Sequence, residues 1–276
     1  MSYQHILKRL PPEHAEAVTE IIETARDPYR TIFLACCKRI HVLGTGGVLG
    51  TGQGRAMSLP VVGLWVDAEL KGQSRIAGQV MPTWYSVLFH EIGHSVDYIT
   101  RPYRATELNA AIRQDVRNTL ERLTTEIDVD QAPRIVERMM RGPRKQNDEQ
   151  MLEWMKRVRE QFVKEMNSVK GTGTERRLMG YSTSGVSDVY GGVTGNQCME
   201  LHHHPLFYWS WIMRSIGISP AMEFFADTFS DGMLGYEARI KLQETYLPTA
   251  NRMITGGPGQ DHDGAIWKVY DRIVKR

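Results

Sequence analysis

The sequence predicts an α+β protein that is predominantly helical and contains a small sheet. Residues 13–38 and the charged runs after Pro102 have helical composition. Two short apolar runs, Arg39–Leu43 and Pro60–Asp67, are typical of strands. A further segment, Ser86–Asp97, spaces apolar residues as a buried helix does. These segments are expected to form one domain over the 276 residues.

The region after Pro102 is predicted to be a helical insertion at about residues 103–170. Its three expected helices are Ala105–Val129, Ala132–Arg141 and Asp148–Val169. Acidic and basic residues alternate along them, which is typical of solvated faces, and the alternative is a cap that recognises substrate. Gly171–Gly195, rich in glycine, serine and threonine, is interpreted as a long loop.

A metal-binding pattern lies in the segment Ser86–Asp97, where residues 90 to 94 are His-Glu-Ile-Gly-His. Side chains four residues apart share a helix face, so His90 and His94 can reach one metal ion. Glu91 lies beside them, where a metal-bound water would be. The alternative is a buried helix with two ordinary histidines. Gly93 favours the metal site because it keeps this side of the helix slim.

A third ligand is expected because catalytic zinc usually binds three protein groups and a water. Asp97 is displaced by about 10 Å along a helix from the first histidine, so we interpret it as a supporting residue. Ser219–Pro220 is a helix-start signal. Glu223, early in that helix, could complete the metal sphere, and Asp227 could accept a hydrogen bond from a ligand imidazole. The alternative is an amphipathic helix with two solvated acids.

Composition excludes several classes of protein. The 34 basic and 32 acidic residues give a net charge of only +2, so no nucleic-acid partner is expected. The three cysteines, Cys36, Cys37 and Cys198, form no disulfide framework and fit a reducing compartment. The glycine-rich run Gly44–Gly50 lacks the spacing of a nucleotide loop. No signal peptide or membrane span is expected, and therefore no membrane partner.

The two motifs together resemble the glutamate zincins, in which His-Glu-x-x-His is followed much later by Glu-x-x-x-Asp on a separate helix. Residues 90–97 and 223–229 are similar to the zinc helix and the third-ligand helix of the anthrax lethal factor protease domains. A second resemblance, over 185–195, 204–209 and the Glu223 helix, is to zincin-like domains of phage minor head proteins and bacterial toxins. The matches are scattered between about residues 60 and 250.

The resemblance implies a zincin-like fold with a small mixed sheet beside the pentad helix, in which Pro60–Asp67 would be the edge strand that pairs with a substrate peptide. It also implies a zinc-dependent endopeptidase that hydrolyses a protein or peptide substrate. Zn²⁺ would be held by His90, His94 and Glu223, with Asp227 and Asp97 as supporting residues. Glu91 would act as the proton shuttle between water and the leaving amine.

Three further residues are candidates for the substrate side of this site. Tyr208 is our first choice as donor to the oxyanion and Tyr181 the second, with packing in the core as the alternative role for both. The anthrax lethal factor protease domains place their tyrosine closer upstream of the ligand glutamate, where this chain has Ile216. His204 lies in a run of three histidines and is assigned a substrate contact, with an exposed imidazole as the alternative.

Two contexts follow for such an enzyme. It would be a toxin effector or a phage-associated protease, found in the cytoplasm or carried in a phage particle. The alternative from a different class is a catalytically inactive zincin-fold structural module of a phage head or particle. A hydrolase of non-peptide substrates is disfavoured because no second ligand cluster or phosphate loop occurs in the sequence.

Overall fold

The computed structural model divides the chain into two compact units that alternate along the sequence. It describes residues 3–8, 10, 12–44, 50–53, 62–65, 75–76, 79–80, 82–141, 148–168, 185–198, 219–256 and 262–275, with the backbone alone between 41 and 84. Unit 1 comprises Met1–Tyr103, Phe225–Tyr236 and Ile254–Arg276, and unit 2 comprises Arg104–Phe224 and Glu237–Met253. The division falls inside a continuous helix between residues 224 and 225.

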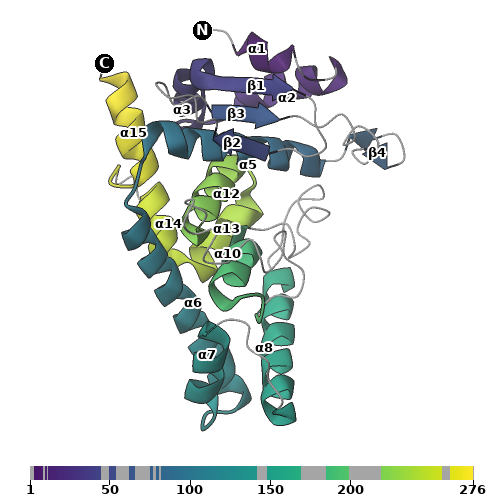
Figure 1. Ribbon diagram of the computed structural model, residues 1–276, viewed down its shortest axis with the longest axis vertical. Coiled ribbons are helices and arrows are strands. Elements are labelled where there is room, and N and C mark those ends of the chain that lie inside the picture. Colours follow the sequence, from purple (N-terminus) through teal and green to yellow (C-terminus); the bar gives the residue numbers. More distant parts are fainter. Residues whose placement is uncertain are drawn as a thin grey trace. The chain divides into compact units, whose positions relative to one another are not determined.

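Unit 1 is built around helix α5, which carries the pentad (Figure 1). Helix α5 spans Pro82–Thr100. The other described helices of the unit are α1 (Gln4–Leu7), α2 (Pro12–Thr24), α3 (Tyr29–Cys36), the short 3₁₀ helix η1 (Cys37–Arg39), α15 (Ala265–Val274) and most of α12 (Pro220–Leu234). The rings of Phe33 on α3 and Phe89 on α5 meet edge to face at 6.4 Å. Both side chains are fully buried, and each such aromatic stabilises the fold by roughly 1.5–3 kcal/mol.

Short strands lie against α5 in the same unit (Figure 1). β1 (Ile40–Gly44) pairs in parallel with β3 (Val62–Trp65), and β3 pairs antiparallel with β2 (Gly50–Gln53), so the order is β1-β3-β2. A separate antiparallel pair joins β4 (Arg75–Ile76) to β5 (Gln79–Val80).

The predicted α+β class, in which a small mixed sheet contributes to the fold, is corrected by this arrangement, because the described core contains almost no strand residue. Where side chains are described, every residue except Ile40 at the start of β1 lies in a helix or a connection, and the described core is made by helices. The strands are backbone ladders of two to five residues. The described part of the protein is therefore predominantly helical, because helices and their connections supply its buried side chains.

The segment Pro60–Asp67 was also expected, by the zincin analogy, to be an edge strand that pairs with a peptide. This expectation is wrong, because β3 within it has β1 on one side and β2 on the other. Its backbone groups are already used in the two ladders, so a bound peptide cannot pair with it.

Unit 2 is helical throughout its described part. The three helices expected after Pro102 are confirmed as α6 (Ala105–Ile127), α7 (Ala132–Met140) and α8 (Glu149–Ser168). The described part of the unit also contains α10 (Gly185–Thr194), α13 (Glu237–Tyr246), α14 (Pro248–Thr255) and the first turn of α12. The rings of Phe162 on α8 and Tyr190 on α10 stack at 4.6 Å. Asp115 on α6 accepts a 2.9 Å hydrogen bond from the Ala250 amide in the first turn of α14. The predicted insertion is thus half of a larger packed unit.

Helix α10 corrects the prediction of a long loop from residue 171 to 195. Every residue from Gly185 to Thr194 is buried. Val186, Val189 and Val193 follow helical spacing, and the glycines between them allow close packing around the helix. Residues 171–184 lie outside the described part. Glycine content favoured a loop, but burial on all sides outweighed the propensity cost of about 1 kcal/mol per glycine.

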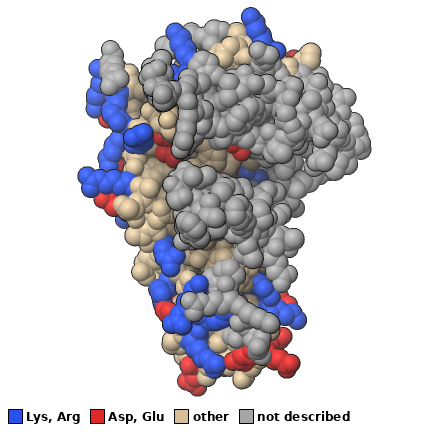
Figure 2. All heavy atoms as spheres, in the orientation of Figure 1, with Lys and Arg blue, Asp and Glu red and all other residues tan. Residues whose placement is uncertain are grey.

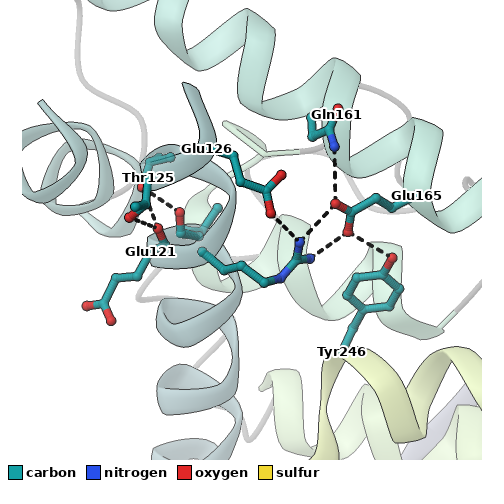
Figure 3. Close-up of polar contacts among 9 residues, drawn as sticks. Glu121, Thr125, Glu126, Gln161, Glu165 and Tyr246 are labelled. Atoms are coloured by element: carbon teal, nitrogen blue, oxygen red, sulfur yellow. Dashed lines mark hydrogen bonds and ion pairs between the residues drawn. The ribbon is translucent and has the colours of Figure 1, made fainter. Parts of the chain in front are cut away.

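An ion-pair network joins α6 and α8 in unit 2. Arg122 donates to Glu165 at 2.9 Å and to Glu126 at 3.3 Å, and Tyr246 on α13 donates to the same Glu165 at 3.4 Å (Figure 3). The hydrogen bond from Arg122 holds the pKa of Glu165 below its usual value, partly offset by burial.

The surface of this unit carries charges of both signs. Figure 2 shows basic and acidic side chains interspersed in the lower part of the view, where Figure 1 places α7 and α8. Pairs such as Arg134 with Asp148, 2.9 Å apart, account for this mixture. Among the described helices, none combines the length and apolar character needed to cross a membrane.

We predict that Glu165→Gln lowers the free energy of unfolding at pH 7 by up to about 1 kcal/mol, as expected for a partly exposed pair. Because the folded-state pKa of Glu165 is depressed, its contribution is present above the unfolded pKa of about 4.3 and is lost as pH falls through the folded value. Urea unfolding of wild type and variant should therefore differ at pH 7 and converge once the pH falls below the depressed folded-state pKa of Glu165. The exposed Glu153→Gln should show no such convergence; equal behaviour of the two variants would contradict the role of the network.

Candidate metal centre

Helix α5 has clear boundaries and one face directed to the core. It begins at Pro82, a residue suited to the first helical position because no amide donor is missed there. Arg101, after its last residue, is left-handed with φ 42° and donates its amide to the Asp97 carbonyl at 2.7 Å. Pro102 then ends the helix. Leu88, Ile92 and Val96 are buried, which confirms the predicted apolar face.

Helix α12 begins as the sequence predicted. It starts at Pro220, and the Ser219 hydroxyl accepts the Met222 amide at 3.4 Å as the N-terminal cap. A second acceptor was not predicted: the Asn109 side chain on α6 accepts the Ala221 amide at 3.1 Å. These two acceptors fix the start of the helix, and Gly235, left-handed at φ 66°, follows its end.

The two helices approach each other very closely through small residues. A Cβ atom added at Gly93 on α5 would lie 2.8 Å from both the Cα and the carbonyl oxygen of Ala226 on α12. One end of the contact is also closed by the Ser230 hydroxyl, which donates to the Ser86 carbonyl at 2.9 Å. Residue numbers rise along one helix as they fall along the other, so the helices are antiparallel.

The close approach brings His90 to Asp227. The imidazole Nδ1 lies 2.8 Å from the carboxylate Oδ1, and the two side chains are 15% and 16% exposed. A carboxylate can only accept, so Nδ1 carries the hydrogen and the lone pair of the neutral ring is on Nε2. That nitrogen is the one left to bind a metal ion. Asp227 thus accepts a hydrogen bond from a pentad imidazole, as predicted.

The pentad side chains form a group suited to one metal ion. The ligand atoms of His90, Glu91 and His94 all lie within 4.8 Å of one another, and these residues are half-buried. The two imidazole rings are 4.5 Å apart and nearly perpendicular. Two nitrogens on one tetrahedral zinc ion are about 3.4 Å apart, so small side-chain rotations would satisfy the coordination distances. The donor set therefore fits zinc.

Asp97, predicted to be a supporting residue and not a ligand, lies outside the group of three. Its carboxylate Oδ2 accepts a 2.7 Å hydrogen bond from the Tyr103 hydroxyl. Burial raises the pKa of Asp97 to about 6, and the hydrogen bond from Tyr103 and the nearby His94 act in the opposite direction.

Glu223 lies in the first turn of α12 and is fully buried. The alternative interpretation of Glu223 as a solvated acid on an amphipathic helix is therefore wrong, because its side chain is shielded from water. As the side chains stand, Glu223 is outside the group formed by the pentad. Three other predicted site residues, Tyr208, Tyr181 and His204, lie outside the described residues.

Tyr103 is a residue of this region that the sequence motifs did not indicate. It follows Pro102 in a connection, where neither helical nor strand periodicity applies. The only available signal was its position directly after the helix that carries the pentad. Its hydrogen bond to Asp97 depends on a turn that only the folded chain defines.

Comparison of the chain with models of known protein families, with curated proteins and with solved structures finds no match. The argument for function therefore depends on the geometry of the pentad and of α12.

We predict that Gly93→Ala weakens zinc binding and destabilises the protein by about 1–3 kcal/mol, the usual cost of overpacking. The added methyl group would meet backbone atoms of Ala226, which cannot rotate away, so α5 and α12 must separate. Zinc titration and thermal unfolding measure the two effects. Gly235→Ala is the control, because it strains the backbone at φ 66° but has open space around the added methyl group. If both variants bound zinc as wild type does, the close approach of Gly93 to Ala226 would not matter to the metal centre.

Proposed function

We propose that this protein is a zinc-dependent endopeptidase that hydrolyses peptide bonds of a protein substrate. The observation that carries the proposal is the hydrogen bond between His90 and Asp227, which orients one imidazole of the pentad with Nε2 available. An imidazole held by a carboxylate in this way is the usual arrangement of a metal ligand. The resemblance of the two motifs to the glutamate zincins supports peptide hydrolysis as the reaction class.

We propose Glu223 as the third ligand, on the basis of helix geometry. Glu223 precedes Asp227 by four residues on α12, so the two lie on one face, one turn apart. Asp227 meets His90, and antiparallel packing pairs each earlier turn of α12 with a later turn of α5. The turn of α5 after His90 is the one that carries His94. Rotation of the Glu223 side chain would then add a carboxylate to the two imidazoles.

The roles of the chain's residues follow from this arrangement. When bound, Zn²⁺ would act as a Lewis acid toward water and the substrate carbonyl. Glu91, half-buried beside the imidazoles, would take a proton from the attacking water and deliver it to the leaving amine. Asp227 would keep His90 in the tautomer with a free Nε2 throughout the reaction. Such an endopeptidase would act as a toxin effector or as a phage-associated protease.

We predict that purified protein binds about one zinc ion per chain, and that Glu223→Gln weakens this binding by at least about 10-fold because the anionic ligand is lost. Asp231→Asn is a matched control: it removes another buried carboxylate from α12, two turns further on. Chelator competition gives both affinities. Equal losses in the two variants would assign Glu223 a structural role only, and a protein that takes up no zinc would refute the metal centre.

We predict that Glu91→Gln retains zinc but loses peptide cleavage by at least about 100-fold, because only the proton shuttle is removed. A peptide library incubated with wild type, with Glu91→Gln and with a chelator provides the measurement. Cleavage by the variant would exclude the mechanism. If wild type binds zinc yet cleaves nothing, the inactive structural module of a phage head or particle becomes the better description.

A further inference from the structure

We propose that Tyr103 is a positioning residue for the metal centre, which holds the metal-binding turns of α5 and α12 in register. This inference rests on the proposed zinc site. Tyr103 contacts Asp97 on one helix and Phe225 on the other. Its side chain thereby links two elements that must each present a ligand to the same ion.

The first contact acts on α5. The Tyr103 hydroxyl donates to Asp97 Oδ2 at 2.7 Å, and Asp97 lies three residues after His94 on the same side of the helix. Tyr103 therefore fixes the position of Asp97, one turn after the second imidazole of the pentad on α5.

The second contact acts on α12. The Tyr103 and Phe225 rings lie 5.5 Å apart with planes tilted by 40°. Phe225 lies between Glu223 and Asp227 in the sequence, and its side chain is fully buried. Its ring stacks with that of Phe229 at 6.5 Å. The tyrosine ring therefore packs against the part of the helix that carries both predicted acidic partners of the centre.

Fixing both helices through one side chain matters because metal coordination has a narrow tolerance. Ligand distances in a zinc site vary by only about 0.2 Å, so a small relative shift of α5 and α12 would remove one ligand from the sphere. Gly93 and Ala226 set how closely the helices approach, and the hydrogen bond from Ser230 to Ser86 restrains one end of the contact. Tyr103 adds a directional hydrogen bond at Asp97 and a ring contact with Phe225, which oppose a relative shift of the helices near the other end.

The experiment compares Tyr103→Phe and Tyr103→Leu with wild type in the full-length protein. Tyr103→Phe keeps the ring contact and loses the hydrogen bond, so zinc affinity measured by chelator competition should fall about 10-fold, as for other partners of metal ligands. Tyr103→Leu loses both contacts, and the fall should approach about 100-fold. In an Asp97→Ala background, Tyr103→Phe should cause no further loss, because the hydroxyl acts through Asp97.

A second readout separates positioning from stability. The visible spectrum of bound Co²⁺ reports coordination geometry, so it should change in the Tyr103 variants even where thermal unfolding of the metal-free protein does not. Tyr270→Phe removes the hydroxyl of another half-buried tyrosine, on α15, and should leave both measurements unchanged. Loss of thermal stability with unaltered zinc affinity and Co²⁺ spectrum would overturn the proposal.

The same samples distinguish failure of this proposal from failure of the zinc site. If His90→Ala abolishes zinc binding and Tyr103→Phe binds as wild type does, the centre exists and Tyr103 does not position it. If His90→Ala binds zinc as wild type does, the pentad is not the metal site, and both proposals are overturned together.

Discussion

The close packing of α5 against α12 is the constraint on which the rest of the centre depends. Gly93 has no side chain, and its backbone lies against that of Ala226 at a distance that no larger residue permits. Only at this separation can the His90 imidazole reach the Asp227 carboxylate in a 2.8 Å hydrogen bond. A glycine is thus as important to the centre as the ligands, because it sets the distance between the helices that carry them.

Polar contacts outside the pentad maintain this helix pair. Ser230 bonds to the Ser86 carbonyl within unit 1, and Tyr103 joins Asp97 to the aromatic side of α12. In unit 2, Asn109 accepts an amide from the first turn of α12. Each of these groups is part-buried or buried, where an unsatisfied partner would cost about 1–3 kcal/mol, so the contacts favour one arrangement of the helix ends.

Local patterns predicted the elements of this protein well where periodicity is strong. The helices after Pro102 and the cap at Ser219 were expected from spacing and residue type alone. Helix α10 was not, because its glycines and serines are typical of loops until burial on every side compensates for their low propensity. The class of the fold was assigned incorrectly for a related reason: short β-prone runs predict strands, but they do not predict which elements make the core.

The sequence by itself determined the chemistry of the candidate centre. His90, Glu91 and His94 lie on adjacent positions of one helix, and Glu223 and Asp227 on one face of another, since both spacings follow from 3.6 residues per turn. Only the tertiary structure decided which imidazole meets Asp227, how closely Gly93 approaches Ala226, and that Tyr103 contacts both helices. Those contacts join residues far apart in the chain or in connections without periodicity, so they depend on packing that no local pattern encodes.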